Sequence, residues 1–216
     1  MSQSKITVID YGIGNLMSVR RGFEHCGATV TFASTESEVL AADKLVLPGV
    51  GAFRIGMDAL IESNLVDAIL AKARLGSPIL GICLGMQLLF SQSDEFGQTK
   101  GLGLIPGKVV HISKFSQDGH RTKIPNIGWR GLLSGEAPRS WSNTILEDIK
   151  PDDEMYFVHS YTGICNDESN KLAGSDYAGF DITAVVRSEN IYGCQFHPEK
   201  SGNSGLRILN SFFKAS

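Results

Sequence analysis

One cysteine in this sequence stands between glycines at a spacing that suits covalent catalysis. The segment Gly81–Gly85 follows a short apolar run at Pro78–Leu80, which predicts a buried strand, and precedes Met86–Phe90, which predicts the start of a helix. This is the pattern of a nucleophile elbow, whose glycines avoid steric clash while the turn lifts the nucleophile out of the sheet. A helix N-terminus would also favour the thiolate of Cys83. A small buried core cysteine is the alternative that these five residues leave open.

A histidine and a carboxylate near the end of the chain could supply the base for this nucleophile. The apolar run Ile191–Phe196 predicts a strand, and His197 and Glu199 follow it with one proline between them. His197 would take the proton from Cys83, and Glu199 would hold the imidazole in the required tautomer. An exposed turn with an incidental histidine is the alternative for these three residues taken alone.

A third feature could stabilise negative charge during the reaction. The short strand predicted at Lys44–Leu47 ends in Pro48–Phe53, which contains a proline and two glycines. Such a loop can aim backbone N–H groups at a developing anion, although it could also be a plain turn between strand and helix. The elbow cysteine, this loop and the His-x-Glu motif are together the three parts of one acyl-transfer site.

The first half of the chain predicts the scaffold that would position these groups. Asn15 is predicted to be a helix N-cap, and a break near Ser63–Asn64 divides a long helical pattern. Alternating strands and helices predict a parallel sheet with helices on both faces. The expected strands are Lys5–Asp10, Thr29–Phe32 and Lys44–Leu47, and the expected helical segments are Leu16–His25 and Arg54–Leu75.

Two glycines after the first strand suggest a dinucleotide-binding turn, but the rest of that fingerprint is missing. Gly12 and Gly14 match its first two glycines, whereas Met17 occupies the third position. No acidic residue ends the second strand, where the fingerprint needs one. We therefore expect these glycines to shape a loop that faces a partner or a ligand.

The second half predicts mostly strands, some of them antiparallel. The whole chain is therefore expected to form an α/β fold, with a mostly parallel central sheet and additional antiparallel strands in the second half. Ile124–Trp129 predicts a compact apolar loop, Phe115–Thr122 predicts a polar loop, and Gly135–Pro151 gives no regular pattern. We expect one domain over residues 1–216. The expected strands are Lys108–Ile112, Met155–Tyr161, Leu172–Ser175, Thr183–Arg187 and Ile191–Phe196, and a closing helix is expected at Ser204–Lys214.

Composition excludes several classes of protein. The 216 residues carry a net charge of −3 without a long block of one sign, which argues against nucleic acid as the main partner. Neither a signal peptide nor a stretch of transmembrane length is seen, so we expect a cytoplasmic protein with no membrane contact. The four scattered cysteines are expected to be free thiols. No Cys/His cluster has zinc-ligand spacing, and we expect no metal and no cofactor.

The motifs resemble those of a known enzyme family. Gly81–Gln87 and Phe196–Glu199 are similar to the signature of class I glutamine amidotransferases. Further segments resemble the glutaminase subunits of imidazole glycerol phosphate synthase, in the same order from Ile6 to the final helix. These segments are Asp10–Leu16, Pro48–Phe53, Ile127–Trp129, Tyr156–Tyr161 and Lys200–Ser201.

The resemblance implies a role for each matched residue. Cys83 would attack the side-chain amide of glutamine and form a thioester, with His197 as base and then acid and Glu199 as its orienter. The oxyanion hole would consist of the N–H of Leu84 and one N–H from Gly49, Val50 or Gly51. Gln87, Glu95 and Ser160 would hold the ends of glutamine, although Gln87 could be a polar residue on a helix face and Glu95 a loop charge. The expected partner face comprises Gly12, Asn15, Trp129, Tyr156, Tyr161 and Lys200.

The family also implies a partner chain. Ammonia would pass to a separate (β/α)₈-barrel cyclase subunit, which makes imidazole glycerol phosphate and aminoimidazole carboxamide ribotide in histidine biosynthesis. We hypothesise that docking and cyclase ligand turn the glycine-rich loop toward an orientation that stabilises the oxyanion. Three alternatives stay open: a paralogue that feeds a different synthase such as one in surface-sugar amidation, a cysteine hydrolase of related fold, and a non-catalytic subunit.

Overall fold

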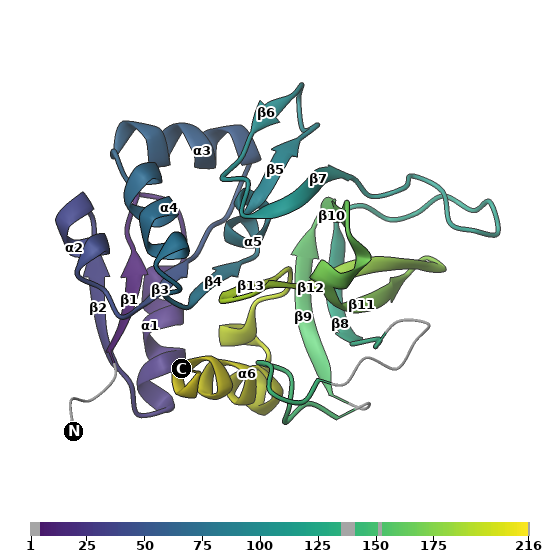
Figure 1. Ribbon diagram of the computed structural model, residues 1–216. Coiled ribbons are helices and arrows are strands. Elements are labelled where there is room, and N and C mark those ends of the chain that lie inside the picture. The colour runs from purple at the N-terminus through teal and green to yellow at the C-terminus, as the bar shows by residue number, and fades with distance from the viewer. Residues whose placement is uncertain (1–4, 135–140, 151–152, 216) are drawn as a thin grey trace.

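The computed structural model describes residues 5–134, 141–150 and 153–215, and its main layer is a sheet of seven strands (Figure 1). The five strands from β13 to β2 are parallel, and β12 and β11 extend the sheet antiparallel. This confirms the mostly parallel sheet with antiparallel additions. In spatial order the strands are β11 (Lys171–Tyr177), β12 (Phe180–Ser188), β13 (Ile191–Cys194), β4 (Ile79–Ile82), β3 (Lys44–Leu47), β1 (Lys5–Ile9) and β2 (Thr29–Ala33).

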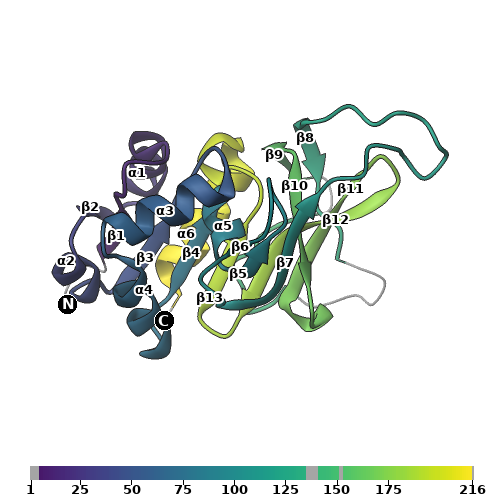
Figure 2. The ribbon, with the colours of Figure 1, turned by 90° about the horizontal axis from the view of Figure 1, so that it is seen from above.

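Helices cover both faces of this sheet, and the alternation of side chains along β1 explains why. Ile6 and Val8 pack with α1 (Leu16–His25) and α6 (Gly202–Lys214), whereas Ile9 packs with α3 (Phe53–Glu62) and α4 (Val66–Arg74). Successive strand residues point to opposite faces, so each apolar face needs its own cover. Figure 2 shows these helices around the strands from above.

Several sequence predictions for this half are confirmed. Asn15 caps α1, because its side-chain oxygen accepts a hydrogen bond from the N–H of Ser18 at 3.3 Å. The helical pattern breaks where predicted, with Asn64 at a positive φ of 55° between α3 and α4. The short helix α2 (Glu36–Leu40), which begins with a capping box at Thr35, was not predicted from the sequence.

The second half forms two smaller sheets beside the main one. In the first, β7 (Ile105–His111) pairs with β5 (Phe90–Ser93) and β10 (Tyr161–Cys165), and β6 (Thr99–Lys100) extends the edge. In the second, β8 (Asn126–Gly131) pairs antiparallel with β9 (Glu154–His159). Short 3₁₀ turns lie at Glu168–Asn170 and Pro198–Lys200. Among the described residues, none of the helices is both long and apolar enough to cross a bilayer.

The helix predicted to start at Met86–Phe90 is shorter than expected. Helix α5 (Leu84–Leu88) has five residues, and Phe90 already belongs to β5. The carbonyl of Leu88 bonds to the N–H of Leu102 instead of continuing the helix. The glycine-rich segment that follows β6 therefore ends the helix by bonding to the carbonyl of Leu88. Local sequence does not reveal this long-range hydrogen bond.

The prediction of a loop over Ile124–Trp129 was wrong from its third residue onward. Asn126 pairs with His159 at the start of the β8–β9 ladder. The sequence pattern of a strand is weak here because the segment contains Gly128, which adopts φ 144°. The strand predicted at Met155–Tyr161 is split at Ser160, where β9 leaves one sheet and β10 enters the other. Part of the predicted irregular stretch, residues 135–140 and 151, lies outside the described residues.

Candidate active site

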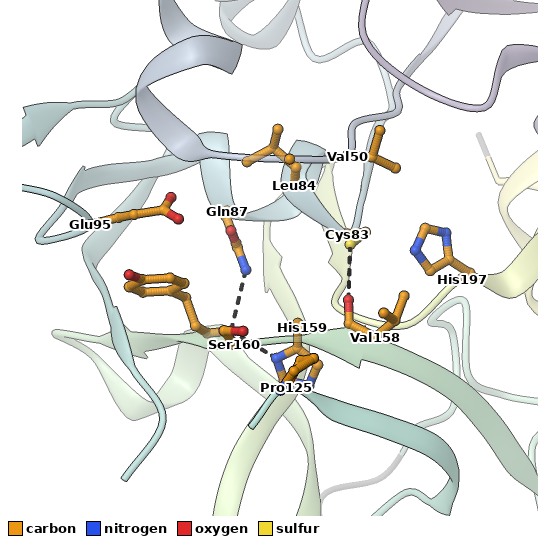
Figure 3. Close-up of a pocket in the computed structure, with 12 residues that line it drawn as sticks. Val50, Cys83, Leu84, Gln87, Glu95, Pro125, Val158, His159, Ser160 and His197 are labelled. Carbon is orange, nitrogen blue, oxygen red and sulfur yellow. Dashed lines mark hydrogen bonds between the residues drawn. The ribbon is translucent and has the colours of Figure 1, made fainter. Parts of the chain in front are cut away.

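A cavity of about 370 Å³ opens beside the C-terminal end of β4, at the point where the main sheet meets the smaller sheets (Figure 3). The C-terminal edge of a parallel sheet is the usual position of ligand sites in α/β folds. The cavity is lined by Val50, Gly51, Cys83, Leu84, Gln87, Glu95, Pro125, Val158, His159, Ser160, Tyr161 and His197.

The elbow at Cys83 has the strained geometry that its sequence predicts. Cys83 adopts φ 55° and ψ −110°, a conformation that costs about 1–3 kcal/mol in a non-glycine residue. A Cβ on Gly85 would lie 1.8 Å from the carbonyl oxygen of Leu47, so only glycine fits there. The N–H of Cys83 bonds to the carbonyl of Cys194 at 2.8 Å, which anchors the turn on β13. The thiol is thus held at the cavity by the sheet itself.

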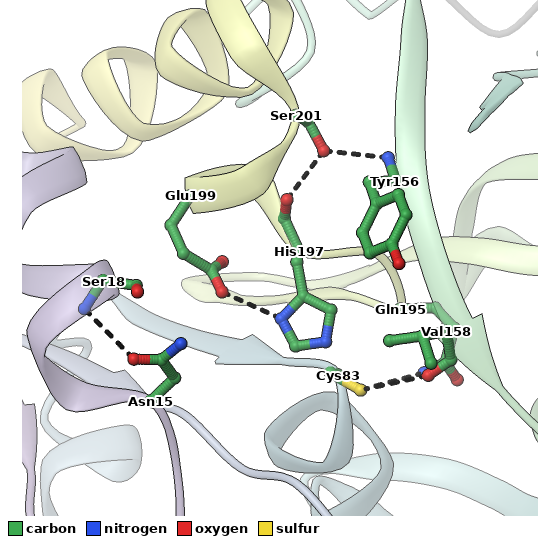
Figure 4. A network of polar contacts seen from close by, with 9 residues as sticks. All are labelled: Asn15, Ser18, Cys83, Tyr156, Val158, Gln195, His197, Glu199 and Ser201. Atoms are coloured by element: carbon green, nitrogen blue, oxygen red, sulfur yellow. Dashed lines mark hydrogen bonds and ion pairs between the residues drawn. The ribbon is translucent and has the colours of Figure 1, made fainter. Parts of the chain in front are cut away.

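His197 and Glu199 form a buried pair beside the thiol (Figure 4). The Nδ1 of His197 lies 2.9 Å from Oε1 of Glu199, and the two side chains are 4% and 1% exposed. The second imidazole nitrogen is therefore free to meet the thiol of Cys83. The hydroxyl of Ser201 donates to the carbonyl of His197 at 2.7 Å and fixes the backbone after β13.

The electrostatics of the pair suit proton transfer. Burial alone would lower the pKa of His197, but the contacts with Cys83 and Glu199 outweigh it and raise the pKa from 6.5 to about 9. His197 can therefore hold the thiol proton at neutral pH and return it later. The sequence predicted these three residues as a nucleophile, base and orienter, and the structure brings all three together.

The glycine-rich loop after β3 lies above the thiol. Val50 and Gly51 line the cavity with Leu84, whereas Gly49 is enclosed: a Cβ on it would lie 2.7 Å from the hydroxyl of Tyr11. That hydroxyl donates to the carbonyl of Pro48 at 2.7 Å, and burial raises the pKa of Tyr11, so the group stays a neutral donor. The start of the loop is fixed, while Gly51, at φ 96°, has open space around it.

Two of the residues predicted to bind glutamine are buried and already engaged. The Nε2 of Gln87 donates to the carbonyl of Tyr161 at 3.3 Å, and Oε2 of Glu95 accepts from the N–H of Phe53 at 2.6 Å. Gln87 is thus not a surface residue of a helix, and Glu95 is not a solvated loop charge. Ser160 borders the same cavity at the bend between β9 and β10.

His159 lines the cavity in a form that excludes acid–base work. Its Nδ1 lies 2.7 Å from the carbonyl of Tyr161, and its Nε2 lies 3.0 Å from Nδ2 of Asn126. Burial is the main cause that lowers its pKa to about 4. A neutral ring that donates at Nδ1 and accepts at Nε2 satisfies both contacts. His159 therefore supports the cavity wall.

The residues predicted for a partner face divide into two groups. Gly12, Asn15 and Lys200 are exposed, and the half-exposed Trp129 packs against Tyr156, with ring centroids 5.7 Å apart and ring planes tilted by 58°. Tyr161, by contrast, lines the cavity, and its pKa is raised by burial and by the charge of Glu95.

Two residues that contact the site had no predicted role. Tyr11 fixes the loop through Pro48, and the buried Gln195 lies against both Gln87 and Cys83. The signal for Gln195 was a polar residue inside the apolar run Ile191–Phe196. None of the four cysteines forms a disulfide bond; Cys26 is half-buried and the others are buried. Within residues 5–134, 141–150 and 153–215, no cluster of three His, Cys, Asp or Glu side chains could hold a metal ion.

Comparison with known proteins agrees with this geometry. Residues 7–215 match the family described as glutamine amidotransferase class-I. The chain is 48% identical over 211 residues to imidazole glycerol phosphate synthase subunit HisH 1 of Legionella pneumophila (strain Lens), covering 98% of this chain and 99% of the relative. The chain belongs to the HisH family of class-I glutamine amidotransferases. The HisH subunit of Sulfurimonas denitrificans is 43% identical, with 97% of each chain covered.

Two solved structures share the fold of this HisH-family chain. The structure of PurLQS from Thermotoga maritima superposes with a TM-score of 0.71 at 19% identity and covers 97% of both chains. A second structure, described as glutamine amidotransferase, has a TM-score of 0.70 at 15% identity, with 95% of this chain and 98% of that chain covered.

Proposed function

We propose that this chain is the glutaminase subunit of an imidazole glycerol phosphate synthase, which hydrolyses glutamine and passes the ammonia to a separate cyclase subunit in histidine biosynthesis. The observation that carries the proposal is the strained Cys83 beside the buried His197–Glu199 pair. The near full-length identity to HisH subunits supports the pathway, because those relatives are named as subunits of that synthase.

The first half of the reaction uses the triad and the loop. The sulfur of Cys83 attacks the side-chain carbonyl carbon of glutamine while His197 holds the thiol proton. Negative charge develops on the carbonyl oxygen, where the N–H of Leu84 and an N–H of the Val50–Gly51 segment would stabilise it. When the tetrahedral intermediate collapses, the C–N bond breaks, His197 returns the proton to nitrogen, and ammonia leaves a thioester on sulfur.

The second half reverses the proton transfers. His197 takes a proton from a water molecule that attacks the thioester, and the released sulfur accepts the proton back as glutamate leaves. Glu199 keeps Nε2 of the imidazole aimed at the sulfur throughout. Glu95 and Gln87 would hold the α-amino end of glutamine, because a buried carboxylate and an amide oxygen suit an ammonium group.

The partner is proposed to be a cyclase subunit on a (β/α)₈ barrel in the cytoplasm, and the exposed Gly12, Asn15, Trp129 and Lys200 would lie at or near the contact. Docking would bias the loop at Gly51 toward the orientation that presents an N–H to the oxyanion.

Steady-state assays of glutamate release test this proposal. The chain alone should hydrolyse glutamine slowly, and adding the cyclase subunit with its ribotide ligand should raise the rate at least about a hundredfold, the value of one oxyanion donor. Full activity in the isolated chain would refute the gating while leaving the triad intact. If neither the ribotide nor the cyclase subunit altered the rate, the chain would serve another synthase.

A further inference from the structure

A fully buried glutamine connects the predicted substrate side of the cavity with the reacting sulfur. Gln195 directly follows β13 and is 0% exposed. Its Oε1 accepts a hydrogen bond from Nε2 of Gln87 at 3.0 Å, and its Nε2 lies 3.9 Å from Sγ of Cys83. Figure 4 shows Gln195 and His197 on different sides of the Cys83 sulfur. The steps described above give this side chain no role.

The direction of the Gln195 amide follows from its neighbours. The backbone carbonyl of Tyr161 can only accept, so the Gln87 atom that faces it at 3.3 Å must be the nitrogen. The same nitrogen faces Gln195, which must therefore present its oxygen to Gln87. The nitrogen of Gln195 is left facing Cys83. The backbone carbonyl of Tyr161 therefore fixes the orientation of the Gln87 amide, which in turn makes Gln195 present its N–H donor to the sulfur.

The surroundings of the sulfur suit both of its protonation states. As a thiol, Cys83 can donate to the carbonyl of Val158, which lies 3.9 Å away. Once His197 has taken the proton, the carbonyl of Val158 has no thiol proton to accept. The N–H of Gln195 is then an uncharged donor that faces the thiolate. Contacts of 3.9 Å are weak for a neutral sulfur, but a donor strengthens its contact with a charged acceptor, most of all away from water.

We propose that Gln195 is a further catalytic residue, a fixed hydrogen-bond donor that stabilises the thiolate of Cys83 and ties the sulfur to Gln87. Its effect on glutamine turnover rests on the proposed function, whereas its contact with the sulfur does not. Loss of the donor should lower the reactivity of Cys83 about three- to tenfold, as expected for one hydrogen bond to a charged group held at long distance.

Alkylation of the full chain by iodoacetamide tests the proposal, because this reagent needs the thiolate but not the glutamine site. The rate at Cys83 is followed from pH 5 to pH 9 by mass spectrometry of its peptide. Gln195→Met keeps the length of the side chain and removes the donor, and should move the rate profile to higher pH by about half to one unit. Gln195→Glu keeps the acceptor for Gln87, yet its charge should move the profile at least as far.

The control is Gln98→Met, the same change at an exposed glutamine that bonds only to Gln92 in the described contacts, and it should leave the profile unchanged. A wild-type profile in Gln195→Met would overturn the proposal. The proposal would also be overturned if Gln195→Met shifted the profile and Gln195→Glu did not. The reactivity of Cys83 would then depend on the oxygen that accepts from Gln87, and not on the N–H donor of Gln195. Absence of glutaminase activity in the wild-type complex, with the shifts intact, would refute the proposed function instead.

Discussion

Removal of one hydroxyl should separate the stability of the catalytic loop from the reactivity of the nucleophile. The hydroxyl of Tyr11 is buried and donates to the carbonyl of Pro48 at 2.7 Å, directly before the loop that borders the cavity. Tyr11→Phe keeps the ring and deletes the donor. The carbonyl of Pro48 is then left unpaired, and the Gly49–Gly51 segment loses its fixed starting point.

The size of the effect follows from these contacts. An unsatisfied buried carbonyl costs about 1–3 kcal/mol, and each kcal/mol lowers Tm by about 2–4 °C in a chain of this length. At about 2 kcal/mol, Tyr11→Phe should lower Tm by about 4–8 °C. Turnover should fall about ten- to a hundredfold, less than the full value of an oxyanion donor, because the loop still samples the productive orientation.

Calorimetry and the glutaminase assay of the complex check the two effects, and alkylation checks that Cys83 itself is unaltered. Tyr177→Phe is the matched control, because Tyr177 is another buried tyrosine whose hydroxyl donates to a backbone carbonyl, that of Lys123, outside the cavity. It should lower Tm without lowering turnover. Equal loss of turnover in both variants, or none in Tyr11→Phe, would refute the anchoring role.

Other predictions concern the remaining groups of the site. His197→Ala should lower kcat by several orders of magnitude and Glu199→Gln by less, since Glu199 only orients the ring; the reverse order would contradict these roles. Because the pKa of His197 is raised to about 9, kcat should fall as pH rises through about 9. The raised pKa also stabilises the fold: this contribution is complete below pH 6.5 and should be lost as pH rises through about 9, which urea unfolding at several pH values measures. Glu95→Gln should raise KM for glutamine about ten- to a hundredfold with little change in kcat, as expected for a lost charged contact; a change confined to kcat would place Glu95 elsewhere in the mechanism.

The elements that carry the triad could be predicted because local signals agreed with the tertiary fold. The strands beside the elbow are fully buried in a parallel sheet and so appear as short apolar runs, as at Lys44–Leu47. The elbow itself needs Gly81 and Gly85, since any Cβ would clash with backbone atoms at 2.7 Å or less. The end of the strand before His197 was likewise predicted, and the parallel pairing of that strand with β4 places His197 beside the elbow.

The parts that could not be predicted depend on distant partners. Phe90 leaves the expected helix because β7 pairs with it, and Ser160 becomes a bend because its two flanks join different sheets. In the sequence Tyr11 resembles an ordinary turn residue, because its hydrogen bond to the carbonyl of Pro48 depends on the tertiary fold. Gln195 did leave a signal, since a polar residue inside a buried apolar run needs internal hydrogen-bond partners.

Product formation by the Cys83→Ala variant in complex with the cyclase subunit tests the central claim most directly. The change removes only the sulfur from a residue that is 8% exposed, so the fold should persist. With glutamine as nitrogen donor the complex should make no imidazole glycerol phosphate, whereas with an added ammonium salt it should make product at the wild-type rate. Continued glutamine-dependent synthesis would contradict the assignment of Cys83 as the nucleophile.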